Sequence, residues 1–174
     1  MSRTKARAAL LRELEAAMRK ASAQGTIFAA AVAERAGISG SDMDCMDFLN
    51  LEGRMTAGRL AELTGLTTGA ITGVVDRLEK AGFVRRERDD SDRRKVFIAA
   101  VPERMIEIGR FYQLMQRAME KQAAGYTDAE LRLLSRYATE SYQSILGATN
   151  ELKAMIEASP KAKPAGIRKP RRNG

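Results

Sequence analysis

Residues 56–101 read TAGRLAELTGLTTGAITGVVDRLEKAGFVRRERDDSDRRKVFIAAV, and this stretch decides the fold. Its pattern predicts a short helix, a tight turn, a second helix and then a two-stranded hairpin. Gly65 is expected to stop the first helix, because glycine adopts the left-handed conformation that a tight turn between helices needs. Thr67 is the expected N-cap of the second helix, which ends at Gly82. A helix-turn-helix followed by a ribbon fits double-stranded DNA.

The second helix has one apolar face and one outward face. Apolar residues recur at helical spacing in a stripe made of Ile71, Val74, Val75 and Leu78. The outward residues of the first turns are small, which lets a helix backbone approach the edges of bases closely. The DNA-contacting residues expected here are Thr67, Thr68, Gly69, Ala70, Thr72, Gly73 and Arg77. The alternative is that they are exposed helix residues without a partner.

The predicted hairpin is rich in arginine. Arg85, Arg86 and Arg88 lie on the outgoing strand, and Val96, Phe97 and Ile98 form the return strand. Cations at such a ribbon can pair with phosphates or enter a minor groove, where negative potential is concentrated. The candidate DNA contacts are Arg86, Arg93, Arg94 and Lys95. The alternative is a solvated hairpin whose turn aspartates pair with neighbouring arginines.

The stretch LAELTGLTTGAITGVVDRLEKAGFVRRERDDSDRR resembles the winged helix-turn-helix core of the MarR family of bacterial transcription regulators. In that family the second helix ends in the pattern V-D-R-L-E-x-x-G-hydrophobic-V-x-R, and the wing carries D-x-R. The matching residues are Val75, Asp76, Arg77, Leu78, Glu79, Gly82, Phe83, Val84, Arg86, Asp92 and Arg94. The match is specific because helix end, strand start and wing all lie at the expected spacing.

The resemblance implies a homodimer that usually represses genes, and many family members lose DNA affinity when a small ligand or an oxidant binds. It places an effector pocket between the DNA reader and the dimerisation helices. Two positions depart from the family pattern. Pro102 follows the wing where a Leu-Thr pair is usual, and proline still suits the first turn of a helix. Gly73 occupies an outward position that often holds a larger polar residue in the family, so the family's base contacts are not carried over to this position.

The flanking segments predict a mainly α-helical fold with a dimerisation region. We expect N-terminal dimerisation helices in residues 1–36, the DNA-binding region in 37–101, and C-terminal dimerisation helices in 102–158. Two apolar helical runs are expected near the start, and Ser39 or Ser41 is expected to cap the helix after them. The core candidates of that capped helix are Met43, Met46, Phe48, Leu49 and Leu51. A capping-box pattern, Thr127-Asp128-Ala129-Glu130, predicts the start of the last helix.

The net charge of +8 comes mainly from the end of the chain. Residues 161–174, KAKPAGIRKPRRNG, hold six of the thirty cations and no acid, which leaves 24 cations against 22 acids before them. Its prolines and glycines predict a flexible basic tail over 159–174. Such an arm either assists DNA binding through phosphates or only adds solubility.

Enzyme classes are largely excluded. The chain has no histidine and one cysteine, so neither a Ser-His-Asp triad nor a zinc finger can be built. No catalytic residue, metal site or cofactor is expected. Cys45 has three aspartates nearby, which disfavours a reactive thiolate, so an inert thiol is favoured over a redox sensor. The methionines either fill gaps in the core or line a pocket for varied apolar ligands.

Together these patterns predict a sequence-specific regulator that binds double-stranded DNA as a homodimer on a pseudo-palindromic operator, typically as a repressor, with release by a small-molecule effector. The alternative is an architectural DNA-binding protein or a winged helix that binds another protein. No apolar run reaches transmembrane length. Glu13 and Glu15 interrupt the apolar stretch that a signal peptide needs, so we expect a cytoplasmic protein without membrane contact.

Overall fold

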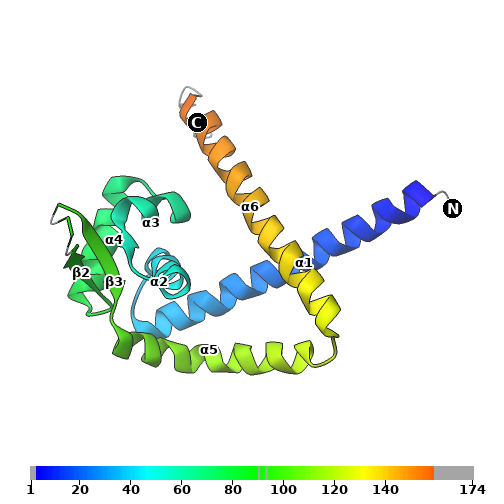
Figure 1. Cartoon of the computed structure of the whole chain (residues 1–174), viewed down its shortest axis with the longest axis horizontal. Coiled ribbons are helices and arrows are strands. Elements are labelled where there is room, and N and C mark those ends of the chain that lie inside the picture. Colours follow the sequence, from blue (N-terminus) through cyan, green and yellow to red (C-terminus); the bar gives the residue numbers. More distant parts are fainter. Residues whose placement is uncertain (1–2, 90, 93, 159–174) are drawn as a thin grey trace, which may run out of the picture. The chain divides into compact units, whose positions relative to one another are not determined.

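The computed structural model describes residues 3–89, 91–92 and 94–158. These residues form two compact units, and the division between them falls between Thr127 and Asp128. The elements shown in Figure 1 are α1 (Arg3–Ala36), α2 (Gly40–Glu52), β1 (Met55–Thr56), α3 (Ala57–Thr64), α4 (Thr68–Lys80), β2 (Val84–Arg88), β3 (Val96–Ala100), α5 (Pro102–Ala123) and α6 (Asp128–Ala158). The mainly α-helical class and the small hairpin wing are confirmed.

The helix-turn-helix of α3 and α4 is built by local chemistry. Gly65 follows α3 in the left-handed region, with φ of 72°, as the sequence predicts. The Thr67 hydroxyl accepts a hydrogen bond from the amide of Ala70 at 3.3 Å and thereby caps α4. Gly82, with φ of 75°, turns the chain from α4 into β2. Gly65 and the Thr67 cap together fix the angle at which α4 leaves α3.

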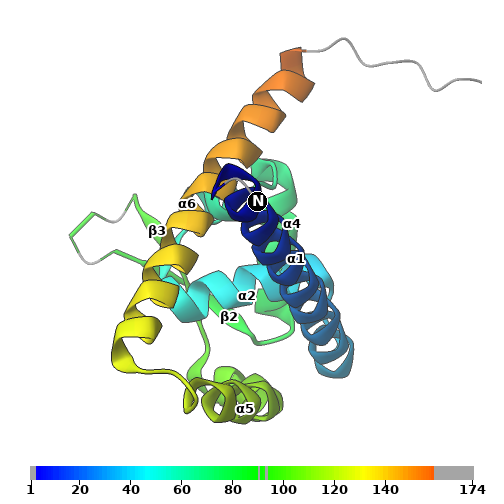
Figure 2. The ribbon, with the colours of Figure 1, turned by 90° about the vertical axis from the view of Figure 1, so that its right-hand side faces the viewer.

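The wing is an antiparallel hairpin of β2 and β3, with Val84 opposite Ala100 and Arg88 opposite Val96. It projects away from the helices of its unit (Figure 2). The sequence did not predict β1, whose Met55 pairs with Ile98 and makes β3 the central strand of three. The base of the wing is therefore tied to the segment that enters α3.

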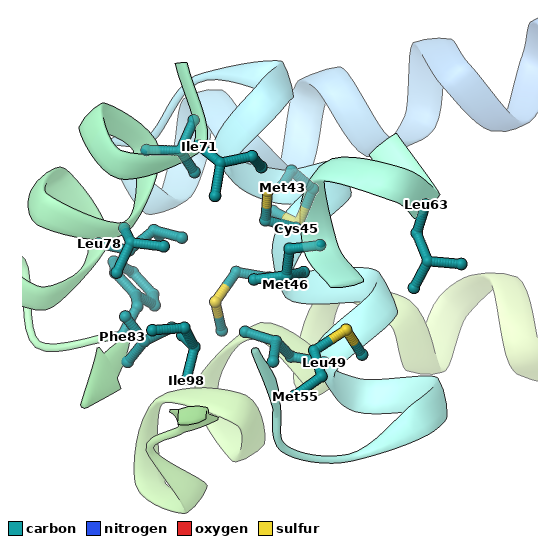
Figure 3. Close-up of a cluster of buried hydrophobic side chains, with 14 of the residues drawn as sticks. Met43, Cys45, Met46, Leu49, Met55, Leu63, Ile71, Leu78, Phe83 and Ile98 are labelled. Atoms are coloured by element: carbon teal, nitrogen blue, oxygen red, sulfur yellow. The ribbon is translucent and has the colours of Figure 1, made fainter. Parts of the chain in front are cut away.

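One hydrophobic core supports the helix-turn-helix and the base of the wing (Figure 3). The apolar stripe of α4, the start of β2 and most core candidates of α2 are buried in this core. The large side chains that are fully buried there are those of Phe83, Met43, Met46, Leu60, Ile71, Leu78 and Ile98. Each such side chain contributes about 1.5–3 kcal/mol of transfer free energy relative to exposure. The prediction was wrong for Leu51, which is 77% exposed because it lies at the end of α2 beyond the core.

The start of the chain forms one helix. The two apolar runs expected there belong to the single α1, whose last turns enter the core through Val32 and Ala33. Gly37, with φ of 73°, follows the last residue of α1 and turns the chain toward α2. Of the two serines offered as a cap for α2, Ser39 fills the position and forms a capping box with Asp42.

The long helices leave apolar side chains uncovered. The exposed ones on α1 and α5 are Leu10, Leu11, Leu14, Met18, Ile27, Ile106, Leu114, Met115 and Met119. Helix α6 begins at Asp128, directly after Thr127. Its exposed large apolar side chains are those of Leu131, Leu133, Leu134, Tyr137, Tyr142, Ile145, Leu152, Met155 and Ile156. Within the residues that the structure describes, no helix combines the length and apolarity needed to cross a membrane. The expected basic tail, 159–174, lies outside the described residues.

Candidate nucleic-acid interface

The outward face of α4 is made of small residues. Thr68, Gly69, Ala70 and Thr72 are exposed, and Gly73 is partly buried. The Thr72 hydroxyl donates a hydrogen bond to the carbonyl of Thr68 at 3.0 Å, so its oxygen keeps lone pairs free to accept from a ligand. This face presents no bulky side chain over its first turns, which permits close approach of another molecule.

Arg77, expected to contact DNA, is held by a carboxylate of the same protein. Its Nη2 donates to Asp42 Oδ1 at 2.6 Å and its Nε donates to Asp42 Oδ2 at 3.4 Å. The Asp42 side chain is 4% exposed and that of Arg77 is 57% exposed. The pair therefore ties α4 to the start of α2 and restricts the guanidinium at its exposed end.

The buried Asp42 carboxylate is ionised. Burial, the largest single cause, raises its pKa, but hydrogen bonds from Arg77 and Ser39 together outweigh burial and leave the pKa below its ordinary value of 3.8. The same carboxylate also accepts from the Ser39 amide at 3.1 Å as part of the capping box. A local cap and a long-range ion pair thus share one side chain.

Arg86 is engaged in a similar way. Its Nη2 donates to Asp76 Oδ1 at 2.6 Å, and its Nη1 pairs with Glu79. The amide of Arg86 also donates to Glu79 Oε1 at 3.1 Å. Both carboxylates lie on α4, so Arg86 fastens the first wing strand to the helix that precedes it. Sequence reasoning missed Asp42, Asp76 and Glu79 as partners of these arginines.

The wing cations are more exposed. Arg94 Nε lies 3.3 Å from Asp92 Oδ1, while the Arg94 side chain remains 93% exposed. Lys95 and Arg88 are exposed and have no ion-pair partner among the described residues. Arg85 pairs with Glu87 at 2.6 Å. Arg93, also expected to contact DNA, lies outside the described residues.

Asp89 organises the described part of the wing turn. Its carboxylate accepts hydrogen bonds from the amides of Ser91 at 3.0 Å and Asp92 at 2.9 Å. The Ser91 hydroxyl also donates to this carboxylate, and its hydrogen bond, followed by those of the two amides, holds the pKa of Asp89 below its ordinary value. The turn aspartates therefore serve partly to shape the backbone, in addition to pairing with arginine.

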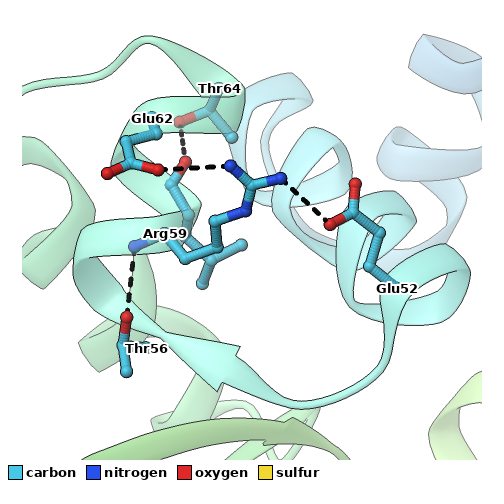
Figure 4. A network of polar contacts seen from close by, with 6 residues as sticks. Glu52, Thr56, Arg59, Glu62 and Thr64 are labelled. Atoms are coloured by element: carbon cyan, nitrogen blue, oxygen red, sulfur yellow. Dashed lines mark hydrogen bonds and ion pairs between the residues drawn. The ribbon is translucent and has the colours of Figure 1, made fainter.

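A second polar network supports the entry to the helix-turn-helix (Figure 4). Arg59 donates to Glu62 at 3.2 Å and to Glu52 at 3.4 Å, and so links α3 to the end of α2. Thr56 caps α3 by accepting from the Arg59 amide at 3.2 Å. Nearby, the Arg54 guanidinium lies 4.8 Å from the ring centroid of Phe97 at the base of the wing.

Cys45 lies in the core and is fully buried. Burial raises the pKa of its thiol to about 11, with smaller contributions from the charges on Asp44 and Asp42. A thiol with this pKa is almost entirely protonated at neutral pH, so the structure favours the inert thiol over the redox sensor.

A hollow of about 380 Å³ lies between α2 and α5. Leu51, Met105, Ile108 and Met115 form most of its wall, together with Asp47 and Tyr112. The hollow therefore lies between a helix of the predicted DNA-binding region and a helix expected to dimerise. Three of its apolar wall residues come from α5, and two of these are methionines.

Comparisons with a family model and with individual known sequences agree on the class of protein. Residues 38–96 match the family model described as MarR family. The HTH-type transcriptional regulator YcgE of Bacillus subtilis strain 168 is 37% identical over 134 residues, which cover 77% of this chain and 87% of YcgE. The HTH-type transcriptional regulator YwaE of the same organism is 30% identical over 83 residues, which cover 48% of each chain.

Comparison with solved structures gives the same fold. A MarR family protein from Bacillus stearothermophilus has a TM-score of 0.60 at 24% identity, over 78% of this chain and 95% of that one. The transcriptional regulator Tm0710 from Thermotoga maritima has a TM-score of 0.57 at 21% identity, over 80% and 98% of the two chains. The shared architecture extends beyond the helix-turn-helix into the flanking helices.

Proposed function

The chain belongs to the MarR family of DNA-binding winged-helix transcription regulators, and from that premise we propose that it is a homodimeric repressor of a pseudo-palindromic operator. Members of this family are regulators rather than enzymes. The observation that carries the proposal is the reading face of α4, which is exposed, free of bulky side chains over its first turns, and fixed in place by the Asp42–Arg77 pair. We place its action in the cytoplasm because its DNA partner lies there.

In this proposal α4 enters the major groove. Thr68, Gly69, Ala70, Thr72 and Gly73 face the bases, with threonine oxygens as acceptors and methyl groups against thymine. Thr67 lies at the helix N-terminus, where backbone amides favour phosphate. Arg77 and Arg86 act mainly by holding α4 and the wing in position, since each is already paired with carboxylates.

The wing supplies contacts to the DNA backbone. Arg94 and Lys95 carry exposed charges, and Arg93, which precedes Arg94 in the sequence, adds a third cation. Phosphate contacts fix the register of the protein on the duplex, while sequence is read at the bases. This division assigns affinity mainly to the wing and selectivity mainly to α4.

A second copy of the chain would cover the exposed apolar residues of α1, α5 and α6. Each of these helices exposes several large apolar side chains, more than a monomer in water usually leaves uncovered. Closed two-fold dimers are the commonest oligomer, and a two-fold axis matches an operator with two half-sites about one helical turn apart, or a multiple of that distance. A small-molecule effector that changes the separation of the two α4 helices would release both half-sites together.

Selection of bound fragments from random DNA tests this function. A regulator should enrich one pseudo-palindromic motif and bind it about 10³-fold or more tightly than bulk DNA at physiological salt. If binding occurs but no motif is enriched, the architectural alternative is correct. If no DNA binds and a protein partner is captured instead, the winged helix is an interaction module.

A further inference from the structure

The charges on α2 are distributed unevenly over its surface. The helix carries four acids, Asp42, Asp44, Asp47 and Glu52, and no cation. Asp42 pairs with Arg77 and Glu52 pairs with Arg59. Asp44 and Asp47 have neither an ion pair nor a hydrogen bond with any described residue. In a chain with net charge +8, two neighbouring carboxylates are thus left without a cation.

Both of these carboxylates line hollows. Asp47 forms part of the hollow of about 380 Å³ between α2 and α5. Asp44 and Asp47 together line a second hollow of about 330 Å³ against α1 and a third of about 300 Å³ against α3. All three are within the first unit, and the hollow at α5 has the largest apolar wall. No cation is among the residues that line them.

The surroundings of Asp47 have negative potential and include an unpartnered hydroxyl. Burial, and then the charge on Asp44, raises the pKa of Asp47. Burial, and then the charges on Asp47 and Asp44, raises the pKa of Tyr112. The Tyr112 hydroxyl oxygen is buried and has no hydrogen-bond partner among the described residues. A buried polar atom of this kind indicates a missing partner, such as a ligand or an ordered water.

We propose that the hollow between α2 and α5 binds a cationic amphiphile, an organic molecule with an apolar body and one ammonium group. The apolar body contacts Leu51, Met105 and Ile108, and the ammonium lies beside Asp47. The Tyr112 hydroxyl accepts a hydrogen bond from the ammonium or from a polar group next to it. This inference rests on the proposed effector release and names the chemical class of the effector.

Charge complementarity decides between classes of ligand. An anion in this hollow would lie beside Asp47 without any lining cation to offset the repulsion. A neutral apolar molecule would contact the apolar wall of the hollow but leave the Asp47 carboxylate without a partner. An ammonium satisfies the carboxylate, and its apolar body occupies a volume within the range of roughly 300–1,000 Å³ that is typical of small-molecule sites. The methionines suit apolar bodies of varied shape.

Three matched probes test the inference on the full-length protein at pH 7: 4-phenylbutylamine, 4-phenylbutanol and 4-phenylbutanoate, a cation, a neutral molecule and an anion on one scaffold. Calorimetry measures binding of each probe to the intact protein without DNA. We expect the amine to bind at one site per chain, the alcohol at least fivefold more weakly, and the carboxylate more weakly still.

Two variants locate the site. Asp47→Asn should weaken the amine at least fivefold and leave the alcohol unchanged. Gly109→Leu should weaken both, because the new side chain fills the hollow from α5. A Cβ at Gly109 meets no atom within 4 Å, so the first carbon of that side chain fits without a clash. Glu62→Gln removes an exposed acid outside the hollow and serves as the control. Circular dichroism and thermal unfolding confirm that each variant is folded.

The inference is overturned if the carboxylate binds as tightly as the amine, or if Asp47→Asn leaves amine binding unchanged. It is also overturned if the intact protein binds no amine, the result expected when a second copy of the chain fills the hollow. Titration of the DNA complex with the amine is measured separately. Amine binding that depends on Asp47 but leaves DNA affinity unchanged supports the site and contradicts only effector release.

Discussion

Asp42 and Arg77 join α2 to α4 across 35 positions of the sequence, with Asp42 Oδ1 2.6 Å from Arg77 Nη2. The acid is buried and the guanidinium is half exposed, so the pair anchors the outer end of the recognition helix to the core. The same carboxylate accepts a hydrogen bond from the amide of Ser39 in the capping box that begins α2. One side chain therefore links the formation of α2 to the placement of α4.

Asp42→Asn should destabilise the fold by about 1–2 kcal/mol, because it removes a charge-assisted hydrogen bond whose strength is partly reduced by solvent at Arg77. Urea unfolding at pH 7 measures the change. Glu62→Gln is the control, since it breaks only the exposed pair with Arg59 and should change stability by less than about 0.5 kcal/mol. Equal effects of the two variants would show that the Asp42 pair is no stronger than a surface pair.

The Asp42 contribution should also depend on pH. Its pKa in the folded state lies below the ordinary value of 3.8, so its stabilisation is fully present above that value and is lost as pH falls through the folded pKa. The stability difference between wild type and Asp42→Asn should therefore be constant from pH 7 to about 5 and shrink below about pH 4. A difference that persists undiminished in acid would contradict an ionised Asp42.

Asp47→Asn should have the opposite effect on stability. The pKa of Asp47 is raised in the folded state, so its ionised form is penalised above that pKa, and the penalty disappears as pH falls toward the value of the unfolded chain. Removing the charge should stabilise the apo protein at pH 7 by up to about 1 kcal/mol, and the gain should vanish in acid. Parallel urea titrations of both proteins from pH 7 to 4 measure this. Destabilisation at pH 7 would mean that Asp47 has a stabilising partner, such as a cation from a second copy.

The elements with local signals could be predicted from the sequence. Gly65, Thr67 and Gly82 act through backbone conformations and caps within a few residues, and the stripe of α4 repeats over several turns. Strand β1 could not be predicted, because a segment of two residues has no periodicity and exists only by pairing with β3. Arg77 and Arg86 could be identified as candidate cations from the sequence. Their carboxylate partners could not be predicted, because those pairs depend on how α2, α4 and β2 pack. Leu51 was predicted to lie in the core because it is apolar and belongs to α2. It is exposed because it lies at the end of that helix, and the sequence alone does not show where the core ends.

Cys45 should react slowly with thiol reagents. Raising the thiol pKa from 9.0 to about 11 lowers the thiolate population roughly 100-fold at neutral pH, and burial blocks access as well. The labelling rate at pH 7.5 should be far below that of free cysteine and should rise with urea, since unfolding exposes the thiol. A rate in buffer at or above that of free cysteine would restore the redox-sensor hypothesis.

Gly73→Ala should separate DNA binding from stability. Alanine is favoured over glycine in a helix by about 0.5–1 kcal/mol, and a Cβ at Gly73 lies 3.6 Å from Arg77 Nη1, an ordinary contact. The variant should therefore be more stable, yet bind its operator about tenfold or more weakly, because the added methyl group keeps α4 from the bases. Gly58→Ala on α3 is the matched control, with a Cβ 3.9 Å from Thr56 Oγ1. A stabilised Gly73→Ala protein with full affinity would remove Gly73 from the reading face.

The wing cations should determine how steeply DNA binding depends on salt. Removing one cation that neutralises a phosphate reduces the slope of log affinity against log salt by about 0.9, so Arg94→Gln and Lys95→Gln should each flatten it by that amount. Arg86→Gln should instead lower affinity with a smaller change of slope, because Asp76 and Glu79 already offset its charge and its main role is to hold the wing. Fluorescence anisotropy over a range of salt concentrations measures all three. If Arg86→Gln flattens the slope as much as Arg94→Gln, Arg86 leaves its carboxylates on binding and contacts phosphate directly, and the division between positioning and contacting arginines is wrong.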